Sequence, residues 1–233
     1  MAFHVGMGGV IFPFSPGGSD MRQYKLTCIN QSGLQGAFCL FWHDTGPASS
    51  VTPLFSLAWL TKTVNPKVTA HLQWDDGYCL VWGESGKLKP GMPFMAGEKS
   101  DADPNAAGKN GLGFSCNDSG FFFCPASKST PNGKLGIYAD SSIPDGAAAI
   151  GVGIGDKPAL VCNALPNLNY IFELSMELWA VFGDLRQGEV LDCGLAMAGE
   201  ALHTRTNAVR VVFGKNIYEK TLTLHQNNTL TVS

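Results

Sequence analysis

Histidine and carboxylate side chains recur near the ends of short apolar segments in the first third of the chain. The group comprises His43, His71, Asp75 and Glu84. A histidine and a carboxylate at hydrogen-bond distance can share a proton, which general acid–base catalysis requires. If neighbouring strands bring these residues to one rim, they form a catalytic site. The alternative is that the histidines cap strands or face solvent.

Four tryptophans lie in the same part of the chain. They are Trp42, Trp59, Trp74 and Trp82, each beside a polar residue or near the end of an apolar segment. Exposed indole faces stack on sugars, lipids or flat ligands, whereas buried indoles fill a hydrophobic core. The pattern predicts ligand-binding residues, with core packing as the alternative.

Motifs for metals, cofactors and covalent catalysis are absent from the sequence or incomplete. The glycines at 151, 153 and 155 lack the spacing of a dinucleotide-binding loop. The segment 101–105 resembles the start of a calcium loop, but Ala106 and Leu112 stand where glycine and glutamate are needed. Zinc-ligand spacing and a GxSxG motif are both missing. We therefore predict no metal and no cofactor.

Charge and hydropathy exclude two classes of partner. Only 15% of the 233 residues are charged, against about 25% in an average soluble domain. The 16 basic residues are outnumbered by 19 acidic ones and form no dense run, so the sequence predicts no nucleic-acid binding. No stretch approaches the roughly 18 apolar residues of a membrane-spanning helix. The sequence therefore predicts a soluble protein.

The cysteines and the first residues indicate a compartment. Seven cysteines are an odd number, and most lie in apolar segments, which predicts buried, reduced thiols. Residues 1–21 are rich in Gly and Pro and lack the basic start of a signal peptide. We predict a flexible arm over 1–21 and a cytoplasmic location.

From residue 22 onward the chain reads as one all-β domain. Short β-branched, aromatic or alternating runs are separated by turn residues, which is typical of an antiparallel β-sandwich spanning 22–233. The only helix is expected near 195–204. The expected strands are 24–30, 36–43, 55–61, 67–74, 78–82, 120–125, 134–139, 148–154, 159–163, 170–174, 177–182, 208–213, 220–225 and 229–232.

Turn chemistry and apolar runs refine this prediction. Asp75-Asp76-Gly77 and Gln226-Asn227-Asn228 each predict a hairpin, because these residues favour tight turns. The polar stretch 99–111 is expected to be a mobile surface loop. The runs 121–124 and 148–154 are apolar on both faces, so they should be covered on both sides.

Several segments resemble a known family. They include Leu57-Ala58-Trp59-Leu60-Thr61-Lys62, Tyr78-Cys79-Leu80-Val81-Trp82-Gly83 and Pro166-Asn167-Leu168-Asn169-Tyr170-Ile171-Phe172. In order and spacing of their Trp, Gly and Pro residues they are similar to the rhizosphere-expressed RhiA-like family over about 22–232. The resemblance implies a soluble β-rich fold and carries over no catalytic residue.

Two hypotheses for function follow. The first is a non-catalytic binding or self-associating module for an apolar or carbohydrate-like ligand, because no strong catalytic motif is present. The second is a cofactor-independent isomerase or cyclase that acts on an apolar small molecule in an aromatic-lined pocket. The low charge also predicts a homo-oligomer whose interface contains Trp42, Trp59, Trp82 or Trp179.

Overall fold

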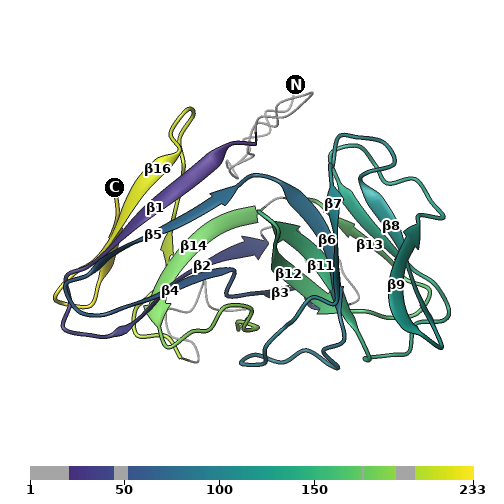
Figure 1. Cartoon of the computed structure of the whole chain (residues 1–233), viewed down its shortest axis with the longest axis horizontal. Helices are drawn as coiled ribbons and strands as arrows, with labels where there is room; N and C mark the ends of the chain where they lie inside the picture. Colours follow the sequence, from purple (N-terminus) through teal and green to yellow (C-terminus); the bar gives the residue numbers. More distant parts are fainter. Residues whose placement is uncertain (1–20, 45–51, 175, 193–202) are drawn as a thin grey trace, which may run out of the picture.

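The computed structural model describes residues 21–44, 52–174, 176–192 and 203–233. Within these ranges the chain forms seventeen strands in four sheets and no helix. The first sheet lies over the second, and the third and fourth occupy the other half of the molecule (Figure 1). The predicted all-β, sandwich-like fold is confirmed. The predicted helix lies outside the described residues except for His203 and Thr204, and the predicted arm does so except for Met21.

The sheets are named here by their strand order. The first sheet contains β17 (Leu230–Val232), β16 (Glu219–Leu224), β1 (Gln23–Asn30) and β5 (Thr69–Asp75). The second contains β15 (Val209–Arg210), β14 (Met176–Gly183), β2 (Gly36–Asp44) and β4 (Leu60–Val64). The third contains β3 (Phe55–Ser56), β12 (Lys157–Asn163), β11 (Ala149–Ile154), β6 (Tyr78–Gly83) and β7 (Glu98–Ala102). The fourth contains β13 (Asn169–Phe172), β10 (Leu135–Ala139), β8 (Gly111–Asn117) and β9 (Gly120–Pro125).

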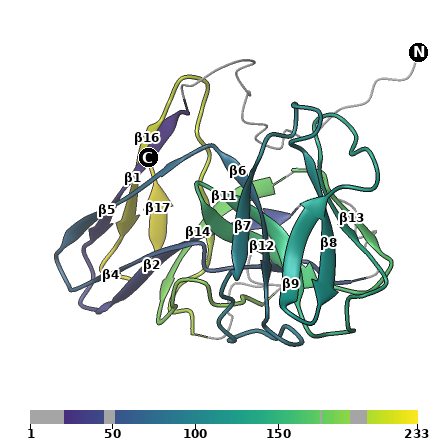
Figure 2. The ribbon, with the colours of Figure 1, turned by 45° about the vertical axis from the view of Figure 1, so that its right-hand side comes forward.

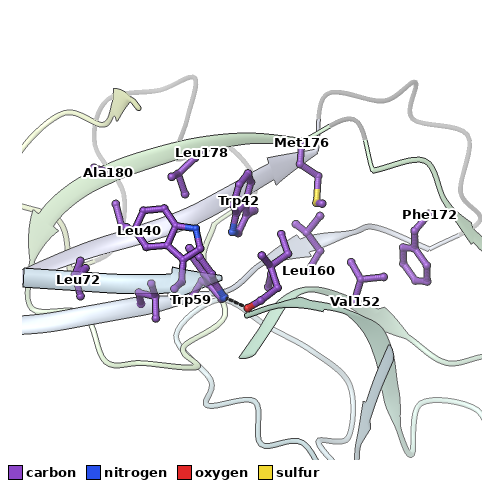
Figure 3. Close-up of a cluster of buried hydrophobic side chains, with 14 of the residues drawn as sticks. Leu40, Trp42, Trp59, Leu72, Val152, Leu160, Phe172, Met176, Leu178 and Ala180 are labelled. Carbon is purple, nitrogen blue, oxygen red and sulfur yellow. Dashed lines mark hydrogen bonds between the residues drawn. The ribbon is translucent and has the colours of Figure 1, made fainter. Parts of the chain in front are cut away.

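All four sheets contribute to one large hydrophobic core. Strand alternation directs every second residue of β14 inward, so that Met176, Leu178 and Ala180 join this core (Figure 3). Two smaller clusters lie on the outer faces of the second and third sheets and cover the opposite side of β2 and β11. The prediction that 148–154 is covered on both sides is confirmed, since β11 is buried throughout.

Two strand pairs are parallel among otherwise antiparallel ones. β1 pairs with β16, and β10 pairs with β8, in parallel register. The remaining pairings are antiparallel, as expected for a sandwich built largely from neighbouring reversals. Figure 2 shows β1 between β16 and β5, so the first sheet joins segments from opposite ends of the chain.

The turn predictions had mixed outcomes. The hairpin over Gln226-Asn227-Asn228 is confirmed: β16 and β17 pair, and the His225 N–H donates to the Thr229 carbonyl at 2.9 Å. The hairpin at Asp75 is wrong, because β5 belongs to the first sheet and β6 to the third. The turn itself forms, with the Gly77 N–H donating to Asp75 Oδ1 at 3.0 Å. The strand that follows this turn, β6, joins the third sheet instead of pairing with β5.

Three further predictions need correction. The expected strand 55–61 is split into β3 and β4, because its two ends pair with different sheets. The expected loop 99–111 instead contains most of β7, an edge strand with one pairing partner. An edge strand has a neighbouring strand on one side only, so its side chains are less covered and can remain polar. The run 121–124 is only half-buried for a similar reason, since β9 is also an edge strand.

Most of the described cysteines are buried, as the sequence predicted. Cys28, Cys39, Cys79 and Cys162 are free and buried, while Cys124 is partly exposed. Burial raises the pKa of Cys28 and Cys162 to about 12 and that of Cys79 to about 11. Burial also raises the pKa of Cys39. These thiols therefore stay protonated in the folded state well into the alkaline range.

Alkaline pH is expected to destabilise the protein. Above about pH 9 the unfolded thiols lose protons while the buried ones keep theirs, so each thiol lowers the free energy of unfolding by about 1.4 kcal/mol per pH unit. This stabilisation is complete below about pH 9 and is lost as the pH rises toward the folded pKa. Urea unfolding at about pH 8 and about pH 10 measures the effect, and Cys28→Ala should show a shallower decline. A free energy of unfolding that does not change over this range would contradict the prediction.

Candidate functional site

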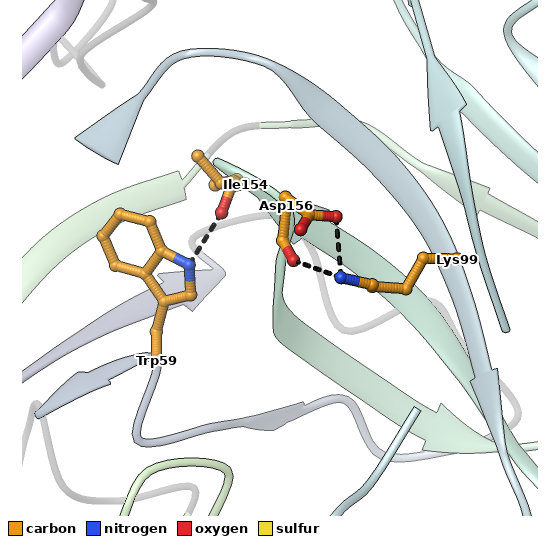
Figure 4. Close-up of polar contacts among 4 residues, drawn as sticks. All are labelled: Trp59, Lys99, Ile154 and Asp156. Atoms are coloured by element: carbon orange, nitrogen blue, oxygen red, sulfur yellow. Dashed lines mark hydrogen bonds and ion pairs between the residues drawn. The ribbon is translucent and has the colours of Figure 1, made fainter. Parts of the chain in front are cut away.

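The four predicted ligand-binding tryptophans are all buried. Trp42, Trp59, Trp74 and Trp82 are between 1% and 8% exposed and belong to the large core. Trp59 packs edge-on against Trp42 and Trp74, with ring centroids 5.5 and 5.4 Å apart. Its indole N–H donates to the Ile154 carbonyl at 2.9 Å (Figure 4). Core packing, the alternative left open by the sequence, describes their position.

The four predicted acid–base residues lie on different sheets or strand ends. His43 is in β2 of the second sheet, whereas His71 and Asp75 are in β5 of the first. Glu84 follows β6. His71 Nδ1 lies 3.2 Å from Thr27 Oγ1. Within the described part of the chain, no hydrogen bond or ion pair joins two of the four residues, so the structure does not assemble them into a single site.

A groove of about 810 Å³ lies between the edge strands of the third and fourth sheets. We call it the edge groove. The groove is formed by β7, by β9 with the segment that follows it, and by the stretch 107–112. The lining residues are Glu98, Ser100, Ala107, Gly108, Asn110, Gly111, Leu112, Phe123, Cys124, Pro125, Ala126, Ser127, Lys128, Ser129 and Thr130. The lining of the edge groove therefore combines hydroxyl and amide groups with apolar side chains.

Glu98 is the carboxylate of the edge groove, and one of its oxygens is held in place. Oε2 accepts the Trp82 indole N–H at 2.8 Å and the Phe123 backbone N–H at 3.1 Å. The second bond is available because β9 is an edge strand, so alternate backbone groups point away from β8. Among the described residues, nothing donates to Oε1. One carboxylate oxygen is therefore fixed and the other can accept a hydrogen bond from a ligand.

Aromatic rings pack against Trp82, the residue whose indole donates to Glu98. Trp82 lies 5.9 Å from both Phe114 and Phe121, measured between ring centroids. Phe123 continues the cluster at 6.0 Å from Phe114. Gly97 lets the chain pass close to Trp82, since a Cβ there would lie 2.7 Å from the indole ring. The rings fix Trp82 and hence the position of Glu98.

The opposite wall of the edge groove is held by buried polar contacts. The Asn110 amide donates to the carbonyls of Thr130 and Pro131 at 3.1 and 3.3 Å. Thr130 Oγ1 lies 2.9 Å from the Tyr138 hydroxyl. At Gly111 a Cβ would lie 2.2 Å from Thr130 Oγ1, so a side chain there would displace the Thr130 hydroxyl.

Sequence reasoning missed Glu98 because it directly precedes the polar stretch 99–111, for which the sequence predicts a loop. The neighbouring signal was present: Glu98 and Ser100 share one face of β7, while Lys99 between them pairs with Asp156 at 2.7 Å (Figure 4). Alternation of this kind is typical of a strand. Without an apolar face, however, it could not be distinguished from a charged loop.

Metal-ligand clusters and membrane-spanning helices are both absent from the described residues. No cluster of three or more His, Cys, Asp or Glu side chains there could hold a metal ion. None of the described segments forms a helix that is long and apolar enough to cross a membrane.

Comparison with known proteins assigns the chain to a family. The model of the RhiA family matches residues 21–233, which is most of the chain. The chain belongs to the RhiA family. Protein RhiA of Rhizobium leguminosarum bv. viciae is 27% identical over 210 residues, covering 89% of this chain and 84% of that protein. No solved structure matches. The RhiA-family match covers all four sheets, which confirms the predicted resemblance.

Proposed function

We propose that this protein is a binding module and that its edge groove holds a carbohydrate-like ligand. The observation that carries the proposal is the carboxylate of Glu98, whose Oε2 is fixed by two N–H donors while Oε1 accepts none among the described residues. Sugar hydroxyls donate well to such an oxygen, because hydrogen bonds to charged acceptors are the stronger kind. Phe123 offers apolar surface beside it for the C–H face of a sugar ring.

The lining favours a hydroxylated ligand over a purely apolar one. Serine and threonine side chains occupy several positions of the groove, at Ser100, Ser127, Ser129 and Thr130. An apolar ligand would remove water from these groups without replacing their hydrogen bonds, which costs free energy. The alternative function, a cofactor-independent isomerase or cyclase, has less support, because its four predicted acid–base residues lie apart.

Binding of soluble oligosaccharides tests the proposal. Maltohexaose, cellohexaose and chitohexaose are titrated separately against the protein by calorimetry and by amide chemical-shift mapping. At least one should bind and shift amide signals of the edge groove. Glu98→Gln keeps the shape of the side chain but removes its charge, so affinity should fall about tenfold, which corresponds to about 1.4 kcal/mol.

Two matched controls accompany this experiment. Glu84→Gln changes a carboxylate outside the groove, and Phe122→Leu changes the neighbour of Phe123 that does not line it. Both variants should bind like the unmodified protein, whereas Phe123→Leu should weaken binding. Failure of all three oligosaccharides to bind, or an equal loss in Glu84→Gln and Glu98→Gln, would count against the proposal.

Location and assembly remain part of this proposal. The free, buried thiols support a reducing compartment such as the cytoplasm. Self-association is supported by the low charge of the chain. Of the four tryptophans expected at an interface, only Trp179 is partly exposed and can contact a second copy, because Trp42, Trp59 and Trp82 are buried.

A further inference from the structure

The fixed carboxylate of the edge groove has no positively charged partner among the described residues. None of the ion pairs in that part of the chain includes Glu98. Its neighbour Lys99 pairs with Asp156 at 2.7 Å. Lys128, the other charged residue of the lining, donates to Asn169 Oδ1 at 3.3 Å. Two neutral N–H donors therefore hold the Glu98 carboxylate without a cation beside it.

The edge of β9 adds a second acceptor next to this carboxylate. The Phe123 N–H donates to Glu98 Oε2, so it points away from β8. In an antiparallel pair the N–H and C=O groups of one residue point to the same side. The Phe123 carbonyl therefore also lies on the open edge of β9, where Glu98 is. Ser100 lies two residues beyond Glu98 on the same face of β7, and its hydroxyl can accept as well.

An aromatic ring stands beside these acceptors. Phe123 lines the edge groove and is half-buried. A ligand cation within about 6 Å of a phenyl ring is attracted to its π electrons. The ring, the free Glu98 oxygen and the outward carbonyl all favour a positively charged hydrogen-bond donor at this end of the groove.

The surroundings favour an organic cation over a metal ion. No cluster of three or more His, Cys, Asp or Glu side chains exists among the described residues, and a hard cation needs several oxygen ligands. Apolar side chains such as Leu112 and Pro125 line the groove as well, and they suit a carbon skeleton. Hydroxyl groups line the rest of it, which suits a ligand that carries hydroxyls of its own. An ammonium group on a hydroxylated skeleton meets all of these conditions.

We propose that the edge groove selects saccharides with free amino groups and binds one protonated amine between Glu98 Oε1 and the Phe123 ring. This inference rests on the proposed function and narrows its ligand to amino sugars. Hydrogen bonds between two charged groups are stronger than those of a neutral donor. An acetylated amine has no charge and a single N–H, so the groove discriminates against it. The net charge of −3 also attracts a cationic ligand.

Three hexasaccharides that differ in one substituent test the inference. The fully deacetylated glucosamine hexamer carries amines where chitohexaose carries acetamides and cellohexaose carries hydroxyls. Each is titrated by calorimetry at about pH 6, where an amine of ordinary pKa is protonated. The glucosamine hexamer should bind about tenfold more tightly than the other two, and all three should shift amide signals of the edge groove. Glu98→Gln should bring the three affinities within about twofold of one another.

Two controls separate the groove from the acidic surface as a whole. Glu84→Gln, which removes a carboxylate outside the groove, should keep the preference for the glucosamine hexamer. Spermine, an amine without a sugar, should bind more weakly than the hexamer. If Glu98→Gln does not fold, the comparison of the three sugars on the unmodified protein still decides.

The outcomes distinguish this inference from the proposed function. Equal affinity for three sugars that all bind in the groove overturns the inference and leaves the proposed function standing. Loss of the preference in Glu84→Gln, or spermine binding as tight as that of the hexamer, also overturns the inference alone. Failure of all three sugars to bind overturns both.

Discussion

Replacing Trp59 with alanine is expected to lower the free energy of unfolding by about 3–5 kcal/mol. The indole is 1% exposed and packs against Trp42 (Figure 3). It also packs against Trp74, so its removal leaves a cavity in the core. The substitution also leaves the Ile154 carbonyl without its hydrogen-bond donor. Urea unfolding followed by far-ultraviolet circular dichroism measures the loss.

Trp59→Phe separates the contribution of apolar packing from that of the hydrogen bond to the Ile154 carbonyl. Phenylalanine keeps much of the apolar packing but cannot donate to Ile154, so its cost should be smaller, about 1–3 kcal/mol. A loss below about 1 kcal/mol in Trp59→Ala would contradict the central place of this side chain in the core.

Gly151→Ala is expected to lower the free energy of unfolding by about 3 kcal/mol. A Cβ at Gly151 would lie 1.9 Å from the Leu160 carbonyl oxygen and 2.8 Å from the Val161 Cα. Both atoms belong to the backbone of β12, which pairs with β11 at this position. Since backbone atoms cannot rotate away, the central strand β11 of the third sheet must separate from its neighbour β12. Thermal and urea unfolding measure the effect.

Gly33→Ala provides the matched control for this prediction. No atom lies within 4 Å of the Cβ position at Gly33. Its stability should therefore stay within about 0.5 kcal/mol of the unmodified protein. Equal stability of the two alanine variants would contradict the prediction.

Local patterns predicted many strands but not their partners. The run 120–125 matches β9 because turn residues bound an apolar segment on both sides. Asp75-Asp76-Gly77 correctly indicated a reversal, yet the sheet that receives the next strand depends on contacts with distant segments. The pairing of β1 with β16 likewise has no local signal.

The site was harder to predict than the fold. The side of a strand that faces the core depends on the sheet that covers it, so polar neighbours such as Asp75 could not show that Trp74 is buried. Glu98 acquires its role only because the edges of two sheets meet.

The position of β1 has a consequence for how the protein is made. β1 can pair with β5 soon after both have left the ribosome, but β16 emerges only after every strand from β2 to β15 has been synthesised. Until then one edge of β1 stays open to other chains. Pairing between such distant segments is slow because a long loop must close first. The first sheet is therefore the part of the nascent protein that depends longest on protection from aggregation.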